Sequence, residues 1–195
     1  AQIGYILLGI SLLNKPGLTA GIIHLFNHAV IKGALFMAVG AFVYRIGSSR
    51  IEDLRGIGKQ MPWMAAAFVA AGLGLIGVPL TAGFISKWYL IQATLDEGAW
   101  WLALLIVGSS LLAVIYVWRV VEAMYLAAPV QEAPVKKAPW SMIVPTWIMV
   151  LASLYFGINT ELTSKAASTA ADLLIQATQI EKVPETVPGA PAAGE

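Results

Sequence analysis

The chain has 195 residues, of which 58% are hydrophobic and only 12% are charged. Soluble domains carry roughly 25% charged residues, so this composition indicates that lipid surrounds most of the chain. A formal net charge of +1 argues against a nucleic-acid partner, and the absence of cysteine excludes disulfides, iron–sulfur clusters and thiolate metal sites on this chain.

The apolar segments predict an all-α integral membrane protein, because backbone polar groups in lipid must pair within a helix. Residues 1–14 are apolar but shorter than the about 20 residues that a spanning helix needs. We therefore expect them to be a truncated helix, and the chain to be the C-terminal part of a longer membrane protein. A transmembrane domain is expected over 1–158, with spans at 18–44, 61–95, 99–126 and 139–158.

The loops predict the orientation of a multi-pass protein in the inner (plasma) membrane. Lys15 is the only base of the first loop, and the third loop holds Asp96 and Glu97 without a base. The positive-inside rule therefore places the loops 45–60 and 127–138 in the cytoplasm and the tail outside. Those two loops hold six bases: Arg45, Arg50, Arg55, Lys59, Lys136 and Lys137.

The tail, 159–195, is polar and rich in alanine, and we expect it to be partly disordered. Its residues 161–180 predict a short surface helix. The weak apolar face of that helix would consist of Leu162, Ala166, Leu173 and Ile180. From Val183 onward the proline-rich sequence predicts disorder.

The span 61–95 is interrupted by Gly77-Val78-Pro79-Leu80-Thr81-Ala82-Gly83, and Lys87 follows one turn later. Proline removes a helix hydrogen bond and glycine loosens the backbone, so this span predicts a discontinuous helix. Discontinuous helices with ionisable groups at the break recur at transport sites. The alternative is a proline kink that only shapes packing, with Lys87 partly reaching toward the outer interface.

Three ionisable residues share one stripe of the first full span: His24, His28 and Lys32, at i, i+4 and i+8. The stripe rises about 12 Å along the helix. A charge at the bilayer centre costs about 2.5–3.5 kcal/mol on insertion scales, which makes such a stripe a candidate functional site. Histidine titrates near neutral pH and a desolvated lysine also exchanges protons, so the pattern is typical of a proton relay.

Other interpretations of this stripe remain. Either histidine could be a packing residue bonded to a carbonyl. The pair could ligate zinc, although neither a third ligand nor a glutamate base lies nearby in the sequence. Lys32 stands roughly 20 Å from the cytoplasmic loop by helical rise, which is too far for its side chain to reach that interface.

Arg119 and Glu122 stand three residues apart near the predicted cytoplasmic end of span 99–126. This spacing favours an interfacial ion pair, and a role in gating or proton exchange is the alternative.

Four motifs resemble one known family, the antiporter-like subunits shared by respiratory complex I and the Mrp-type multisubunit cation/proton antiporters. Residues 24–36 (HLFNHAVIKGALF) resemble the signature helix of that family, residues 53–62 (DLRGIGKQMP) its following loop, and residues 77–87 (GVPLTAGFISK) its second broken helix. The opening Gln2-Ile3-Gly4-Tyr5 fits as well. The match runs in order across roughly residues 1–125, and the D-type Mrp subunit is the most similar.

The resemblance implies a fold of fourteen helices with two inverted repeats, of which this chain would be the end of the tenth helix through the fourteenth. It implies that His24, His28 and Lys32 belong to a central polar axis, and that Lys87 is the ionisable residue of the half-channel to the outside. The glutamate and lysine of the family's first repeat have no counterpart here.

The expected function is therefore that of a proton-translocating subunit in a multisubunit Na⁺(K⁺)/H⁺ antiporter, beside other membrane subunits. The alternative is a proton-pumping subunit of an NADH–quinone oxidoreductase or a membrane-bound hydrogenase. A passive membrane scaffold is the third hypothesis. We expect no cofactor, no metal and no redox chemistry on this chain.

Overall fold

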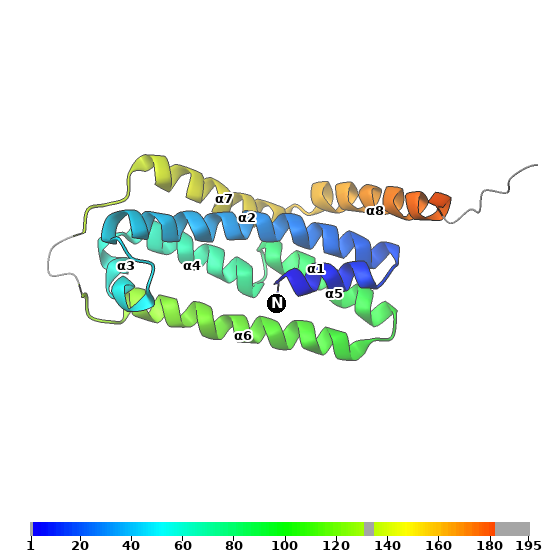
Figure 1. The fold of residues 1–195 in the computed structure, drawn as a ribbon, viewed down its shortest axis with the longest axis horizontal. Helices are drawn as coiled ribbons and strands as arrows, with labels where there is room; N and C mark the ends of the chain where they lie inside the picture. The colour runs from blue at the N-terminus through cyan, green and yellow to red at the C-terminus, as the bar shows by residue number, and fades with distance from the viewer. Residues whose placement is uncertain (1, 131–134, 182–195) are drawn as a thin grey trace, which may run out of the picture.

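The computed structural model describes residues 2–130 and 135–181, with side chains described as far as residue 178. Within these residues all regular elements are helices, and Figure 1 shows them as an elongated bundle. The predicted fold class, an all-α membrane bundle, is confirmed. The α-helices are α1 (Gln2–Ser11), α2 (Lys15–Ile46), α3 (Ile57–Gln60), α4 (Pro62–Ile76), α5 (Ala82–Asp96), α6 (Trp100–Tyr125), α7 (Trp140–Ile158) and α8 (Glu161–Glu181), and a 3₁₀ helix covers Ile51–Leu54.

Helix α2 is the centre of the bundle. Its start is fixed by Asn14, whose side-chain oxygen accepts a hydrogen bond from the Gly17 N–H at 2.7 Å, and by a proline in the first turn. Its end is fixed by Gly47, whose φ of 75° favours glycine. Between these ends α2 runs along most of the bundle and contacts α1, α4, α5, α7 and α8 (Figure 1).

Helices α4 and α5 together form the interrupted element. Gly77, at φ 91°, ends α4, and the side-chain oxygen of Thr81 caps α5 by accepting from the Phe84 N–H at 3.4 Å. The two helices meet so closely at Gly83 that a Cβ there would collide with the carbonyl oxygen of Gly74. Figure 1 shows α5 continuing from α4 along the same side of α2.

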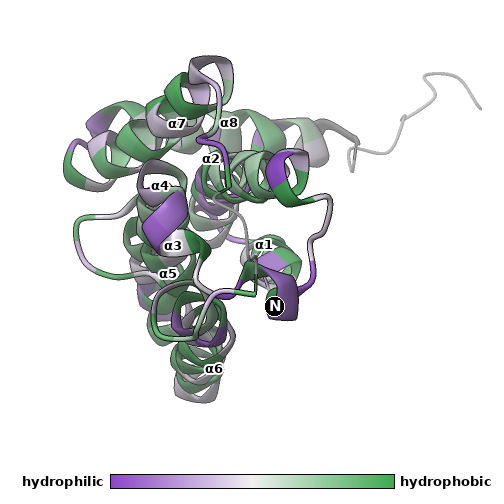
Figure 2. Cartoon of the chain, turned by 90° about the vertical axis from the view of Figure 1, so that its left-hand side faces the viewer, coloured by the Kyte–Doolittle hydropathy of each residue, from purple (hydrophilic) through white to green (hydrophobic). Residues whose placement is uncertain are grey.

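Three helices, α2, α6 and α7, are long and apolar enough to cross a membrane. Helices α4 and α5 have 15 residues each, so neither reaches the spanning length of about 20 residues alone, while the pair does. Hydrophobic residues dominate the helices around the bundle (Figure 2), and large apolar side chains of α6 point outward. Leu104, Leu111 and Ile115 are each more than 60% exposed.

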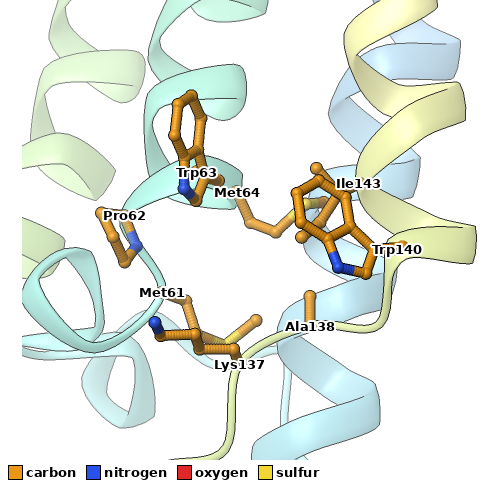
Figure 3. A pocket seen from close by; sticks show the side chains of 8 residues that line it. All are labelled: Met61, Pro62, Trp63, Met64, Lys137, Ala138, Trp140 and Ile143. Carbon is orange, nitrogen blue, oxygen red and sulfur yellow. The ribbon is translucent and has the colours of Figure 1, made fainter.

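The end of the bundle near α3 is packed with apolar side chains. The Gly56 N–H donates to the Ala123 carbonyl at 3.0 Å and ties the 45–60 loop to the end of α6. A cavity of about 150 Å³ lies between the start of α4 and the start of α7, with Lys137 as the single ionisable side chain of its lining. Figure 3 shows the side chains around it. Its lining is Met61, Pro62, Trp63, Met64, Lys137, Ala138, Trp140 and Ile143. None of His24, His28, Lys32 and Lys87 lines this cavity.

Helix α8 lies along the N-terminal half of α2 (Figure 1). The residues of the predicted apolar face are not the ones that pack against α2. Ala167 and Ala171 are 3% and 0% exposed, whereas Leu162 and Leu173 are 63% and 61% exposed. Small alanine side chains let two helices approach closely, and this close approach selects the face that packs. The side chain of Ile180 and the predicted disorder from Val183 lie outside the described residues.

Candidate functional site

Lys87 occupies the second turn of α5 and is 5% exposed. Its ammonium Nζ donates to the carbonyl oxygens of Leu75 at 3.0 Å and Ile76 at 2.8 Å. These carbonyls belong to the last turn of α4, where helix carbonyls have no intrahelical partner and the helix dipole is negative. The interruption of the helix therefore creates the acceptor site that holds this lysine.

A cavity of about 240 Å³ adjoins Lys87 between α5 and α6. Gly77 and Ser110 also line it, and the buried Ser110 hydroxyl has no hydrogen-bond partner among the described residues. Apart from Lys87 and Ser110, the side chains that line this cavity are apolar.

His24 on α2 is 2% exposed and lies against α5 and α1. Its Nδ1 is 2.9 Å from the Ser86 hydroxyl, and its Nε2 is 3.1 Å from the Gln2 side-chain oxygen. The ring of Tyr5 packs edge-on at 5.2 Å. Since Ser86 directly precedes Lys87 in the sequence, the hydrogen bond from His24 joins the α2 stripe to the lysine site on α5.

The three residues of the predicted stripe have different surroundings in the structure. His28 is half-buried and stacks on His24 with ring centroids 6.0 Å apart. Lys32 is also half-buried, and its Nζ lies 4.8 Å from the centre of the Phe36 ring. Neither His28 nor Lys32 has a hydrogen bond or an ion pair to any described residue. His24 thus contacts both His28 and the residue beside Lys87, whereas Lys32 lies next along α2 from His28 and contacts the Phe36 ring.

Sequence reasoning missed the roles of three polar side chains near these residues, of which Tyr5 and Asn27 are buried and Gln2 is half-buried. Asn27 donates from Nδ2 to the Ala82 carbonyl at 2.8 Å, across the start of α5. Tyr5 bonds Ser109 at 2.5 Å, and its ring lies 5.4 Å from the Lys87 ammonium. Gln2 bonds His24 as described above. The only signal in the sequence is that Gln2, Tyr5 and Asn27 are polar residues within apolar runs.

Arg119 and Glu122 do not form the predicted ion pair. Both side chains are exposed on α6. The salt bridges among the described residues are Lys15–Asp172 and Lys165–Glu161. A role of Arg119 and Glu122 in gating stays a prediction.

The described part of the chain contains no group of three His, Cys, Asp or Glu side chains that could hold a metal ion. The two histidines instead have a serine, a glutamine and each other as neighbours. Of these side chains, the two histidines are the ones that can accept and release a proton near neutral pH.

The helix bundle and its buried ionisable cluster define a multi-pass membrane protein with an intramembrane polar site. The chain belongs to the family described as the NADH:quinone oxidoreductase/Mrp antiporter transmembrane domain, whose model matches residues 1–113. The family resemblance drawn from the sequence motifs is therefore confirmed.

Individual relatives come from both branches of this family. The chain is 39% identical over 174 residues to NADH-quinone oxidoreductase subunit N of Desulforudis audaxviator, covering 83% of this chain and 35% of that protein. It is 29% identical over 174 residues to the D-type Na(+)/H(+) antiporter subunit of Bacillus subtilis, covering 89% of this chain and 35% of that protein. The chain thus spans about a third of the length of these curated relatives.

A solved structure, the Mrp complex from Dietzia sp. DQ12-45-1b, contains a similar chain. The TM-score is 0.84 at 29% identity, over 92% of this chain and 42% of that chain. The similarity therefore extends beyond the residues 1–113 that the family model matches.

Proposed function

We propose that this chain is the C-terminal part of a proton-translocating subunit in a multisubunit Na⁺(K⁺)/H⁺ antiporter. In this proposal Lys87, His24, His28 and Lys32 carry the proton through the membrane. The observation that supports it most directly is the 2.9 Å contact between His24 and Ser86, which links the α2 stripe to the residue beside Lys87.

The proton would enter or leave at the Lys87 ammonium, which lines the adjoining cavity. The Leu75 and Ile76 carbonyls, at 3.0 and 2.8 Å, hold the ammonium when it is charged. Loss of that proton removes a positive charge close to His24 and His28. In a low-dielectric interior a charge at such a distance acts strongly, so the change alters how readily the histidines take up a proton. Lys32 would continue the path along α2.

The proposal includes the orientation of the chain in the membrane. The 45–60 and 127–138 loops carry six bases and would face the cytoplasm, in an inner (plasma) membrane. Lys87 on α5 would then connect to the outside, where the chain between α5 and α6 emerges. The tail that includes α8 would begin beside the outer half of α2.

A second candidate is a proton-pumping subunit of an NADH–quinone oxidoreductase. The 39% identity to the subunit N of such an enzyme, against 29% to the D-type antiporter subunit, favours it. The TM-score of 0.84 to an Mrp complex supports the antiporter. Vesicles that hold the full complex decide between them: an antiporter moves protons when a Na⁺ or K⁺ gradient is applied, and a pump moves them when NADH is oxidised.

The replacement Lys87→Ala tests the shared part of both candidates. In the full-length protein within its complex, we expect proton flux to fall at least about tenfold, because the relay loses its exchangeable ammonium. Lys165→Ala is the matched control, since Lys165 is an exposed lysine that pairs only with Glu161 among the described residues. Undiminished flux with Lys87→Ala would favour the passive scaffold and end the proposal.

A further inference from the structure

The cavity between α5 and α6 places two hydrogen-bond donors in an apolar setting. The two helices pack side by side (Figure 1), and Lys87 on α5 and Ser110 on α6 both line the cavity of about 240 Å³ between them. Among the described residues of this lining, Lys87 is the single ionisable one. The cavity therefore has one positive charge and no carboxylate of its own lining to balance it.

The Lys87 ammonium retains one hydrogen without an acceptor. An ammonium group donates three hydrogen bonds. The carbonyl oxygens of Leu75 and Ile76 accept two of them, at 3.0 and 2.8 Å, and the ion pairs formed within the described residues do not include Lys87. The ring of Tyr5, 5.4 Å from Nζ, offers a π face but no oxygen. The third hydrogen and the charge are therefore open to an acceptor from outside the described residues.

The Ser110 hydroxyl is the second donor without an acceptor. A serine in a helix can bond the carbonyl four residues earlier. Here that carbonyl, of Ile106, already accepts from the hydroxyls of Tyr5 at 3.3 Å and Ser109 at 3.1 Å. The Ser110 oxygen is buried and has no partner in the described part of the chain. Because a buried hydroxyl without a partner costs free energy, a ligand that accepts from it gains affinity.

The other walls of the cavity connect it to the surroundings of the bundle. Trp88, Val107 and Leu111 line it and are exposed. In a membrane, exposed apolar side chains of this kind meet lipid chains, which are as apolar as leucine. An apolar tail can therefore lie on these three side chains while its polar end reaches Lys87 and Ser110.

A carboxylate is the headgroup that suits these two donors. Its two oxygens accept several hydrogen bonds at once, and bonds between charged groups are roughly twice as strong as neutral ones. The charged headgroup of a phospholipid lies at the interface, whereas Lys87 lies about 13 Å along the helix from the end of α5 at Asp96. A single carboxylate is small enough to lie at that depth, where the ammonium neutralises it.

We propose that this cavity binds a fatty acid from the bilayer, with its carboxylate on Lys87 and Ser110 and its chain along Trp88, Val107 and Leu111. The binding itself depends only on these contacts. Its consequence rests on the function proposed above, in which Lys87 exchanges protons. A bound carboxylate favours the charged form of the ammonium and fills the cavity beside it, so proton flux falls.

Equilibrium binding of radiolabelled palmitate to the purified full-length complex in detergent tests the site. We expect saturable binding. Hexadecanol has the same chain length without the charge, and it should displace the label at least about tenfold less effectively. Val107→Trp fills the cavity and should remove one bound palmitate per complex. The matched control is Val114→Trp: Val114 lies two turns further along α6, is 40% exposed against 45% for Val107, and does not line the cavity.

Two further variants test the polar end of the site. Ser110→Ala removes one donor and keeps the shape, so it should weaken palmitate binding at least about fivefold. Lys87→Ala should remove the preference for palmitate over hexadecanol, because the charge is gone. If Val107→Trp does not assemble, Ser110→Ala decides alone, by weaker binding or by unchanged binding.

Equal palmitate binding to the wild type and to Val107→Trp would overturn the proposal. Equal displacement of the label by palmitate and hexadecanol would do the same. A cavity that another part of the complex already fills gives no difference between the wild type and Val107→Trp, and so also contradicts the fatty-acid site.

Flux measurements separate this inference from the proposed function. In vesicles that hold the full complex, palmitate should lower proton flux more in the wild type than in Val107→Trp. Comparison at the same palmitate concentration cancels the protons that the fatty acid itself carries, and equal lowering contradicts the inhibition. Normal flux in Lys87→Ala removes the relay but not the binding site. Unchanged palmitate binding in Val107→Trp and Ser110→Ala, with lost flux in Lys87→Ala, removes only the fatty-acid site.

Discussion

The two halves of α2 pack in different ways. Toward its C-terminus the buried residues are all apolar: Ile31, Ala34, Ala38, Ala41 and Phe42. Toward its N-terminus the buried set includes Thr19, His24 and Asn27. The apolar half faces α3, α4 and the start of α7, whereas the polar half faces α1 and the broken end of α4–α5. One helix thus serves as a packing element over one half and as part of an ionisable site over the other.

The difference follows from where unpaired backbone groups are available. A continuous helix has no free carbonyls or N–H groups along its length, so the apolar half offers nothing that could hold a charge. The interruption between α4 and α5 leaves the carbonyls of Leu75 and Ile76 at the end of α4 without intrahelical partners, and they bond Lys87. Asn27 bonds the Ala82 carbonyl in the first turn of α5. Lys32 lies at the boundary of the two halves and finds no such acceptor among the described residues.

The largest effect on stability is expected from a cavity in the apolar half. Phe42 is fully buried, and Phe42→Ala should lower the free energy of unfolding by about 3–5 kcal/mol. Denaturant titration of the purified full-length complex measures this loss. Phe36→Ala on the same helix is the control, because Phe36 is 67% exposed. We expect flux per folded complex to stay unchanged with Phe42→Ala, and a changed pH dependence would contradict the separation of the two halves.

A smaller loss, about 1 kcal/mol, is expected from Asn27→Leu in the polar half. The change removes the 2.8 Å bond to the Ala82 carbonyl, but it also removes the Asn27 side-chain oxygen, which is buried without a partner. The two effects partly cancel. Asn27→Asp should cost more in the same titration, because a carboxylate cannot donate to that carbonyl. If Asn27→Asp is as stable as Asn27→Leu, the hydrogen bond to the Ala82 carbonyl does not stabilise the polar half as we expect.

The smallest effect is expected at the rim of the polar half, where α8 is held to α2. Lys15 and Asp172 pair at 2.8 Å, with side chains 50% and 45% exposed. An ion pair this exposed contributes about 0–1 kcal/mol and weakens with added salt. A double-mutant cycle with Lys15→Ala and Asp172→Ala measures the coupling. A coupling above about 2 kcal/mol would show that the rim resembles the buried contacts rather than the surface.

Much of the bundle could be predicted from residue pattern alone. Long apolar runs such as 99–126 predict helices because lipid leaves no other partner for the backbone. The interruption at Gly77 to Gly83 is visible because proline and glycine act on their own chain, independently of what packs around them. The motifs around His28 and Lys87 identified the family for the same reason: they are local in sequence.

Predictions that depended on contacts between helices were less accurate. The sequence predicted an apolar face on α8 that includes Leu162 and Leu173, but it did not predict that Ala167 and Ala171 would pack closely against α2. The spacing of Arg119 and Glu122 favoured an ion pair, but both side chains are exposed to the surroundings instead. Spacing shows which residues share a face, and it does not show what that face meets.

The sequence by itself determined that lipid surrounds the chain and that one span is broken. It also determined that His24, His28, Lys32 and Lys87 are ionisable residues within apolar spans, where a charge costs free energy. Tertiary structure alone decided which groups each of them contacts. It packed His24 against Ser86 and Gln2, turned the last carbonyls of α4 toward Lys87, and left Lys32 beside Phe36. The physical reason is that hydrogen-bond acceptors for a buried charge come from other helices, whose placement no local pattern encodes.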